Sequence, residues 1–255
     1  MRLDLFLVEK KLAISRTQAQ DFIRHGFVFL KTTNNSIVLK KPSFEVTTEL
    51  AGSISVQSNE LQKYVSRAGL KLEYALEHLN RDVEGLSVLD IGQSTGGFTD
   101  CLLQKNAGLV VGIDVGQGQL HASLANLPRL HSFENLHVKD LGVREDFLKT
   151  VPANQFDLVV MDVSFISITK VMSYLKPFLK NNGSFLFLVK PQFELGPNAL
   201  DKNGIVKDVK NYAIVEQIIR KEAEIIFGSV LNYFKSSVVG KDGNQEFFIY
   251  GKKIH

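Results

Sequence analysis

From residue 86 onward, the chain alternates short apolar runs with amphipathic segments. The runs Ser87–Ile91, Leu109–Asp114 and Phe156–Asp162 are rich in Val, Ile and Leu, which is typical of strands buried in a parallel sheet. Apolar residues at helical spacing mark Lys210–Phe227 as a long amphipathic helix. Strands that alternate with helices predict an α/β doubly wound sheet with both faces covered.

The same patterns predict the other elements of this region. Ser229–Ser236 and Glu246–Gly251 are expected to form a closing antiparallel pair. Further strands are expected at His137–Leu141 and Ser184–Lys190, and further helices at Phe98–Asn106, Gly118–Ala125, Leu175–Leu179 and from near Ser66.

The first 60 or so residues have a different texture. Residues 3–12 follow a short helical pattern, and Ser15 reads as the N-cap of a helix over Arg16–His25 that Gly26 closes. Two β-like pieces, Phe27–Leu30 and Ile37–Leu39, precede irregular and short-strand sequence from Pro42 to Val56. Residues 57–62 are polar and predict a linker, so we expect a small domain at 1–60, a linker at 61–65 and a larger domain at 66–255.

Composition excludes several classes of protein. The 255 residues are 44% apolar and 22% charged, which favours a folded chain over disorder. No apolar run approaches the roughly 18 residues of a membrane span, and the N-terminus lacks the pattern of a signal peptide. One cysteine permits no internal disulfide, which favours the cytoplasm, and the scattered histidines predict no metal site. The net charge of +3 is only weakly suggestive of nucleic acid.

The segment VLDIGQSTGGF carries the strongest local signal, a strand followed by a turn of small residues and a helix. Its glycines let the backbone approach a ligand, and the helix N-terminus offers free N–H groups. The spacing is not that of the dinucleotide fingerprint, and the Lys-Ser/Thr of a P-loop is absent. The turn is closer to the first motif of S-adenosylmethionine-dependent methyltransferases, although a plain strand–turn–helix corner is the alternative.

Acidic residues and one lysine follow the expected strands. Asp114 could accept the ribose hydroxyls of a nucleoside, or cap a helix, and Asp140 could accept an adenine amine, or be a surface acid. Asp162 and Lys190 would face the crevice beyond the strand ends. Burial disfavours a charged lysine and would let Lys190 act as a base, whereas a strand-end lysine can also extend to solvent.

These segments together resemble the TlyA family, which joins an S4-type RNA-binding domain to an FtsJ-like ribose 2′-O-methyltransferase domain. At the front, RLDLFLVEKKLAISRTQAQDFIRHGFV and KKPSFEV look like the S4 signature. The later blocks are YVSRAGLKLEYAL, VLDIGQSTGGFTDCLL, GIDVGQGQL, MDVSFIS, LVKPQFELG and GNQEFF. Their order and spacing cover nearly the whole chain, which implies an S4-like domain followed by a Rossmann-like domain with a mostly parallel seven-stranded sheet.

The resemblance implies a catalytic Lys-Asp-Lys-Glu set, which falls on Lys71, Asp162, Lys190 and Glu246. Taken alone, Lys71 reads as a solvated helix residue and Glu246 as an ordinary strand-start acid. The implied cofactor is S-adenosylmethionine. Its implied contacts are Asp90, Gly92, Ser94, Thr95, Gly96, Gly97, Phe98, Asp114, Asp140 and Leu141.

Three positions depart from the family pattern. The segment FLKTTNNSIVLKK lacks the Val-Asn-Gly typical of S4 modules, Gln93 replaces a small residue, and Lys207 stands where Arg is expected. None of these changes removes a member of the catalytic set.

The implied function is methylation of the ribose 2′-OH of a cytidine in ribosomal RNA, with ribosomal subunits as partners. Basic residues of the first domain and its border would bind RNA phosphates. Two alternatives stay open, a non-catalytic RNA-binding or ribosome-assembly factor and a membrane-active haemolysin. The residues expected to bind RNA are Arg2, Arg16, Arg24, Lys40, Lys41 and Arg67.

Overall fold

The structure is a computed structural model that describes residues 1–24, 26–32, 35–56, 63–240 and 243–254. The chain separates into two compact units, Met1–Leu70 and Lys71–His255, and the division falls within one helix, α4 (Ala68–His78). Each unit is described by itself. The linker predicted at residues 57–62 lies outside the described residues, and the domain boundaries remain a prediction.

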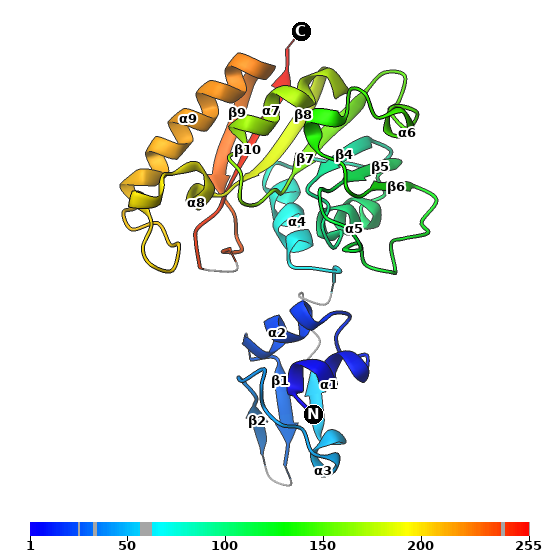
Figure 1. The fold of residues 1–255 in the computed structure, drawn as a ribbon, viewed down its shortest axis with the longest axis vertical. Coiled ribbons are helices and arrows are strands. Elements are labelled where there is room, and N and C mark those ends of the chain that lie inside the picture. The colour runs from blue at the N-terminus through cyan, green and yellow to red at the C-terminus, as the bar shows by residue number, and fades with distance from the viewer. Residues whose placement is uncertain (25, 33–34, 57–62, 241–242, 255) are drawn as a thin grey trace. The chain divides into compact units, whose positions relative to one another are not determined.

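The first unit packs short helices on a small antiparallel sheet (Figure 1). Ser15 Oγ accepts the Gln18 N–H at 3.2 Å, which confirms it as the N-cap of α2. The segment predicted as irregular and short-strand sequence contains a one-turn helix, α3. The elements are α1 (Leu3–Glu9), α2 (Arg16–Arg24), β1 (Val28–Lys31), β2 (Ser36–Val38), α3 (Thr48–Ala51) and β3 (Ile54–Val56), with sheet order β2-β1-β3.

The second unit is built on a seven-stranded sheet in the order β6-β5-β4-β7-β8-β10-β9. Strands β6, β5, β4, β7 and β8 run parallel, and β10 pairs antiparallel with both β8 and β9. The predicted doubly wound sheet and its closing antiparallel pair are therefore confirmed. The strands are β4 (Ser87–Ile91), β5 (Leu109–Ile113), β6 (Leu130–Phe133), β7 (Phe156–Met161), β8 (Leu179–Val189), β9 (Gly228–Lys235) and β10 (Phe247–Lys253).

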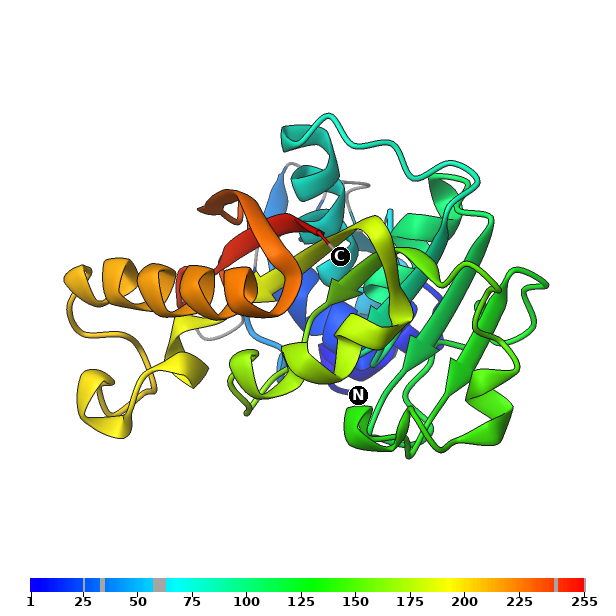
Figure 2. The ribbon, with the colours of Figure 1, turned by 90° about the horizontal axis from the view of Figure 1, so that it is seen from above.

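Helices cover both faces of this sheet, as Figure 2 shows from above. On one face, Phe227 of α9 packs on Phe185 and Phe187 of β8. On the other face, Phe98 of α5 stacks on Phe248 of β10. The helices are α4, α5 (Gly97–Gln104), α6 (Glu145–Leu148), α7 (Thr169–Leu175), α8 (Pro191–Glu194) and α9 (Lys210–Phe227), with 3₁₀ turns at Val138–Asp140, Lys176–Phe178 and Pro197–Ala199.

Two predicted elements of the second unit are wrong, and the helix predicted at Leu175–Leu179 is displaced, because α7 ends at Leu175, a 3₁₀ turn follows and β8 begins at Leu179. The third parallel strand is β6, Leu130–Phe133, and the segment predicted as that strand holds a 3₁₀ turn at Val138–Asp140. As an edge strand, β6 needs few apolar residues, so its sequence lacks the apolar run that marked β4 and β5. The segment predicted as a helix at Gly118–Ala125 forms turns, because the Gly118 and Gln119 N–H groups donate to the Glu134 carboxylate.

Candidate active site

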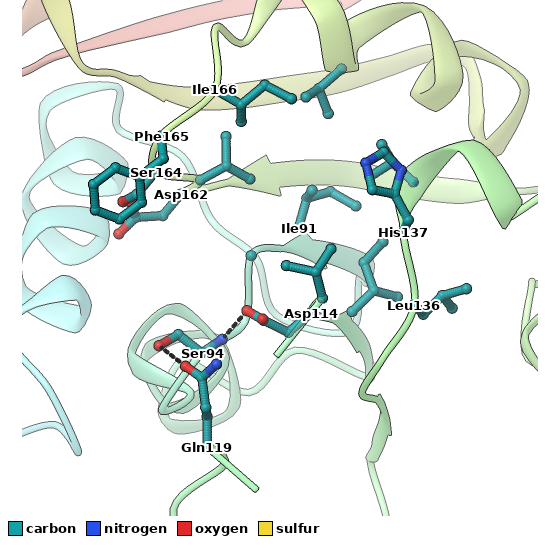
Figure 3. Close-up of a pocket in the computed structure, with 16 residues that line it drawn as sticks. Ile91, Ser94, Asp114, Gln119, Leu136, His137, Asp162, Ser164, Phe165 and Ile166 are labelled. Carbon is teal, nitrogen blue, oxygen red and sulfur yellow. Dashed lines mark hydrogen bonds between the residues drawn. The ribbon is translucent and has the colours of Figure 1, made fainter. Parts of the chain in front are cut away.

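A cavity of about 580 Å³ opens at the carboxyl ends of the parallel strands in the second unit. Figure 3 shows that its walls come from the segments following β4, β5, β6 and β7. Ligands of open α/β sheets bind at this edge, and mostly apolar walls with a few polar groups suit a small molecule. The polar side chains in the lining are Ser94, Asp114, Gln119, His137, Asp162 and Ser164.

The turn after β4 packs closely on the backbone at Asp162, while the close approach to a ligand that its glycines predicted stays a prediction. Gly92 has φ +79°, and a Cβ added there would lie 2.6 Å from the Asp162 carbonyl oxygen. Only glycine satisfies both conditions. The Ser94 N–H donates to Asp114 Oδ2 at 2.8 Å, and the Ser94 hydroxyl donates to Gln119 Oε1 at 3.0 Å (Figure 3). These bonds fix the turn against the end of β5, so the cavity floor is rigid.

Asp90 lies fully buried at the end of β4, beneath this turn. Thr99 Oγ1 donates to Asp90 Oδ2 at 2.6 Å, Gln93 Nε2 donates to Thr99 Oγ1 at 2.9 Å, and Ser132 Oγ donates to Gln93 Oε1. Burial raises the pKa of Asp90 to about 7, against the opposing effect of the Thr99 hydrogen bond. Gln93, which stands where the family pattern has a small residue, thus connects the turn to β6.

Two buried ion pairs lie beside the cavity. Lys71 Nζ lies 2.5 Å from Glu246 Oε2, with both residues at most 7% exposed. Lys190 Nζ lies 2.7 Å from Asp162 Oδ1 and donates to Ser164 Oγ, also at 2.7 Å. Asp162 belongs to both features, because it lines the cavity and pairs with Lys190.

Strand pairing explains why residues so far apart in sequence meet here. The Asp162 N–H donates to the Ile91 carbonyl, which continues the β4–β7 pairing beyond the strand end. Phe247 of β10 pairs with Val189 of β8, and the two strands are antiparallel. Glu246, just before β10, and Lys190, just after β8, therefore lie at the same end of the strand pair. The structure therefore gathers the predicted catalytic set at one edge of the sheet, while the catalytic role of its members remains a prediction.

The predicted cofactor contacts divide into two groups. Gly92, Ser94 and Asp114 line the cavity. Asp90 lies beneath the turn, and Gly97 and Phe98 are buried in the first turn of α5. Within the described chain, the predicted contacts that are not part of the cavity lining are Asp90, Thr95, Gly96, Gly97, Phe98, Asp140 and Leu141.

Asp140 does not end a strand, contrary to the expectation. It is an exposed residue of the 3₁₀ turn, and the neighbouring Leu141 is buried. His137 lines the cavity instead, with its Nδ1 accepting the Lys139 N–H at 3.1 Å (Figure 3). The acid that directly follows β6 is Glu134, which holds the loop of Gln119 through two backbone N–H groups.

Among the cavity residues that sequence reasoning missed are three polar side chains and one aromatic ring: Gln119, His137, Ser164 and Phe165. Ser164 and Phe165 belong to the block MDVSFIS, from which only the strand-end acid was selected. The Phe165 ring is 91% exposed at the cavity, and its backbone has φ +64° (Figure 3). The exposed aromatic ring and the left-handed backbone mark Phe165 in the structure, but a φ value cannot be predicted from the sequence here.

The arginines among the predicted RNA-binding residues of the first unit form ion pairs with two buried aspartates, Asp4 and Asp21. Asp4 accepts from Arg2 Nε at 3.0 Å, Arg16 Nε at 2.9 Å and Gln20 Nε2 at 3.0 Å. The Arg2 hydrogen bond is the main reason that the pKa of Asp4 lies well below its ordinary range. Both arginines remain about half exposed, so their outer N–H groups face solvent.

The other predicted RNA-binding residues differ in exposure. Arg24 and Arg67 lie 4.0 and 3.6 Å from Asp21, and the side chain of Arg67 is only 16% exposed. Lys40 and Lys41 are exposed. Arg67 is therefore the least accessible of the six residues expected to bind RNA.

The described residues contain neither a candidate metal-binding group nor a candidate membrane-spanning helix. No group of His, Cys, Asp or Glu in the described segments has an arrangement that could bind a metal ion. None of the described helices combines the length and the apolar content that crossing a membrane requires.

The chain matches two family models, the FtsJ-like methyltransferase over residues 64–253 and the S4 domain over residues 1–50. It is 38% identical to hemolysin A of Brachyspira hyodysenteriae, over 98% of this chain and 99% of that protein. It is 34% identical to the 23S rRNA (cytidine-2′-O)-methyltransferase TlyA of Campylobacter jejuni, over 98% of each chain. A solved structure from Streptococcus thermophilus that bears a hemolysin name is 33% identical, with a TM-score of 0.75, over 100% of this chain and 88% of that one.

Proposed function

The chain belongs to the TlyA family, in which an S4 domain precedes an FtsJ-like methyltransferase domain, and we propose that it methylates ribosomal RNA. The reaction is transfer of a methyl group from S-adenosylmethionine to the ribose 2′-OH of a cytidine. The observation that carries this proposal is the Lys190–Asp162 pair at the wall of a cavity with a glycine-formed floor.

The cavity fits the proposed cofactor. The floor at Gly92 leaves no room for a Cβ because the Asp162 backbone packs against it, which brings the turn after β4 and the Asp162 strand end together at the cavity. The Asp114 carboxylate at the end of β5 would accept the ribose hydroxyls, and Ile113, Val115, Leu136 and Val138 supply apolar surface for the adenine. S-adenosylmethionine supplies a methyl group already activated by its sulfonium.

Lys190 is proposed as the base of the reaction. Lys190 Nζ would take the proton of the 2′-OH, and the bound S-adenosylmethionine would supply the methyl group that the ribose oxygen receives. In the structure Lys190 Nζ donates to Ser164 Oγ and lies 2.7 Å from Asp162 Oδ1. A lysine acts as a base only without its extra proton, and Asp162 is the carboxylate placed to receive that proton. Proton transfer by a positioned side chain contributes about 10²- to 10⁴-fold to rate.

Lys71 and Glu246 are proposed to steady the substrate. Glu246 holds the Lys71 ammonium at 2.5 Å in a buried setting, where its charge interacts strongly with a nearby hydroxyl or phosphate. Phe165 offers a flat exposed face at the cavity, on which the base of an unstacked nucleotide could lie. The half-exposed arginines held by Asp4 are proposed to bind RNA phosphates without reading sequence.

The test is methyl transfer from labelled S-adenosylmethionine to intact ribosomal subunits taken from cells that lack this protein. We expect label at one cytidine and resistance of the adjacent bond to alkali, because alkaline cleavage needs a free 2′-OH. Label elsewhere on the base would contradict the ribose assignment.

Three other results would redirect the proposal. Cofactor binding without label on either subunit would indicate a different RNA substrate. Failure to bind the cofactor would favour a non-catalytic RNA-binding protein. Lysis of cells by the purified protein without cofactor would support the haemolysin alternative.

A further inference from the structure

The segment between β7 and α7, residues 162–168, contacts Lys190 at two points. Besides the ion pair with Asp162, the Ser164 hydroxyl accepts a hydrogen bond from Lys190 Nζ at 2.7 Å. A lysine ammonium has three N–H groups. The Ser164 hydroxyl therefore takes one of them, and the Asp162 carboxylate lies 2.7 Å from the same nitrogen as its ion-pair partner on the same short loop.

Glu194 holds this loop in place. Its Oε2 accepts the Ser167 hydroxyl at 2.5 Å, and its Oε1 accepts the Ile168 N–H at 3.0 Å. Burial raises the pKa of Glu194, the expected effect of removing a carboxylate from water for a structural contact. A carboxylate whose two oxygens hold adjacent residues of one loop restricts both the position and the direction of that loop.

The loop needs such an anchor because its backbone is strained. Phe165 has φ +64°, a left-handed region that is sterically unfavourable for a bulky residue. The Phe165 ring also contacts the Phe193 ring, with centroids 5.1 Å apart. Phe193 and Glu194 both belong to α8, whose N-cap is Lys190 itself. The lysine and the two anchors of its partner loop are thus carried by a single five-residue segment.

We propose that Ser164 and Glu194 are positioning residues for Lys190. Glu194 fixes the loop, and the loop presents the Ser164 hydroxyl as a hydrogen-bond acceptor and the Asp162 carboxylate as an opposite charge, which together aim the nitrogen of Lys190 toward the substrate hydroxyl. A lysine on a flexible four-carbon stem needs such restraint, since a displacement of 1 Å at a reacting centre can cost about 10²-fold in rate. This inference rests on the proposed function, in which Lys190 is the base.

The first experiment compares Ser164→Ala with wild type in single-turnover methyl transfer at saturating subunits and S-adenosylmethionine. We expect the rate to fall at least about tenfold while both dissociation constants stay unchanged. Ser164→Thr, which keeps the hydroxyl, should restore most of the rate. Glu194→Ala should act in the same direction, and Glu194→Gln, which keeps one acceptor oxygen, should lose less. The matched control is Ser173→Ala on α7, an exposed serine in the same unit, which should match wild type.

A Ser164→Ala rate within about twofold of wild type would overturn the proposal. So would a rate loss that is matched by weaker cofactor binding, because that result marks a structural role.

A second measurement does not depend on methyl transfer. Trace labelling of amines with acetic anhydride, read by mass spectrometry, reports how freely Lys190 Nζ reacts. Ser164→Ala should raise labelling of Lys190 severalfold, whereas Ser173→Ala should not. Unchanged labelling would overturn the positioning role even if wild type proved inactive on ribosomal RNA, which would be a failure of the proposed function alone.

Discussion

Each unit of this protein buries an aspartate, and the two carboxyl groups have opposite ionisation behaviour. Asp4 in the first unit accepts hydrogen bonds from two arginines, a glutamine and the Leu5 N–H, and its pKa lies well below the ordinary range. Asp90 in the second unit accepts from Thr99, and burial raises its pKa to about 7. Both side chains are fully buried, so burial alone does not set their charge.

The difference follows from the donors that the surrounding fold supplies. Cationic and N–H donors compensate the lost hydration of Asp4, which stays an anion and organises basic side chains at a surface. Asp90 lies under the cofactor turn, where Asp162 and Asp114 add negative charge and raise its pKa further. A buried carboxylate thus serves as a charge anchor in one unit, whereas in the other it keeps its proton up to about pH 7.

The largest expected effect is on the methyl-transfer rate, and it distinguishes the second unit, which is proposed to carry the chemistry, from the first, which is proposed to carry the affinity. Lys190→Ala should lower the single-turnover rate by about 10²- to 10⁴-fold and leave subunit affinity unchanged. Arg16→Ala should do the reverse, weakening affinity by about tenfold at low salt with an unchanged rate at saturation, because a charge-assisted phosphate contact is lost. Rate and binding assays on both variants check this. An equal loss of rate in both would mean that the units do not divide affinity from chemistry.

The second prediction concerns the pH dependence of stability. Between pH 3.8 and about 7 the folded chain keeps the proton of Asp90 that the unfolded chain has lost. Folding stability of the second unit should therefore fall as pH rises through this window, by on the order of 4 kcal/mol in total. Asp90→Asn should remove this slope, measured as hydrogen-exchange protection of the β4 amides. A slope that persists in the variant would assign it to another group.

The contribution of Asp4 to folding stability depends on pH in the opposite direction to that of Asp90. Its folded pKa is depressed, so its contribution is present above the ordinary aspartate value and is lost as pH falls below about 4. Protection of the α1 and α2 amides should fall on acidification in wild type and change less in Asp4→Asn.

A third, smaller effect sharpens the role of Asp4 at the surface. Asp4→Asn keeps the side-chain shape but removes the charge that holds Arg2 and Arg16. If those arginines bind phosphates from a fixed arrangement, subunit affinity should fall severalfold although the unit gains a positive charge. Tighter binding in the variant would show that net charge matters more than the arrangement. Glu9→Gln, an exposed acid at the end of α1, is the matched control for the charge change.

The smallest expected effect is local to α2. Ser15→Ala removes the acceptor of the Gln18 N–H and should destabilise the first unit by about 1 kcal/mol. Ser15→Asp should restore the loss. Exchange protection of the α2 amides checks both variants, and the β4 amides of the second unit should not respond.

Local sequence determined much of the architecture. The apolar runs identified β4, β5 and β7, the amphipathic stretch gave α9 its bounds, and Ser15 marked the start of α2, because these signals depend on neighbours along the chain. The edge strand β6 escaped, since pairing on one side leaves little demand for apolar residues. The candidate catalytic set came from the resemblance, because Lys71 alone reads as an ordinary solvated residue.

Tertiary structure decided which side chains meet. Lys71 and Glu246 are 175 positions apart and form one buried pair. Ser164 reaches Lys190, and Glu194 reaches Ser167, because β7 and β8 are neighbouring strands. The same holds for charge, since Asp4 and Asp90 are identical residues in sequence. Ionisation depends on burial and on donors that arrive from distant segments, and only strand order and packing determine these.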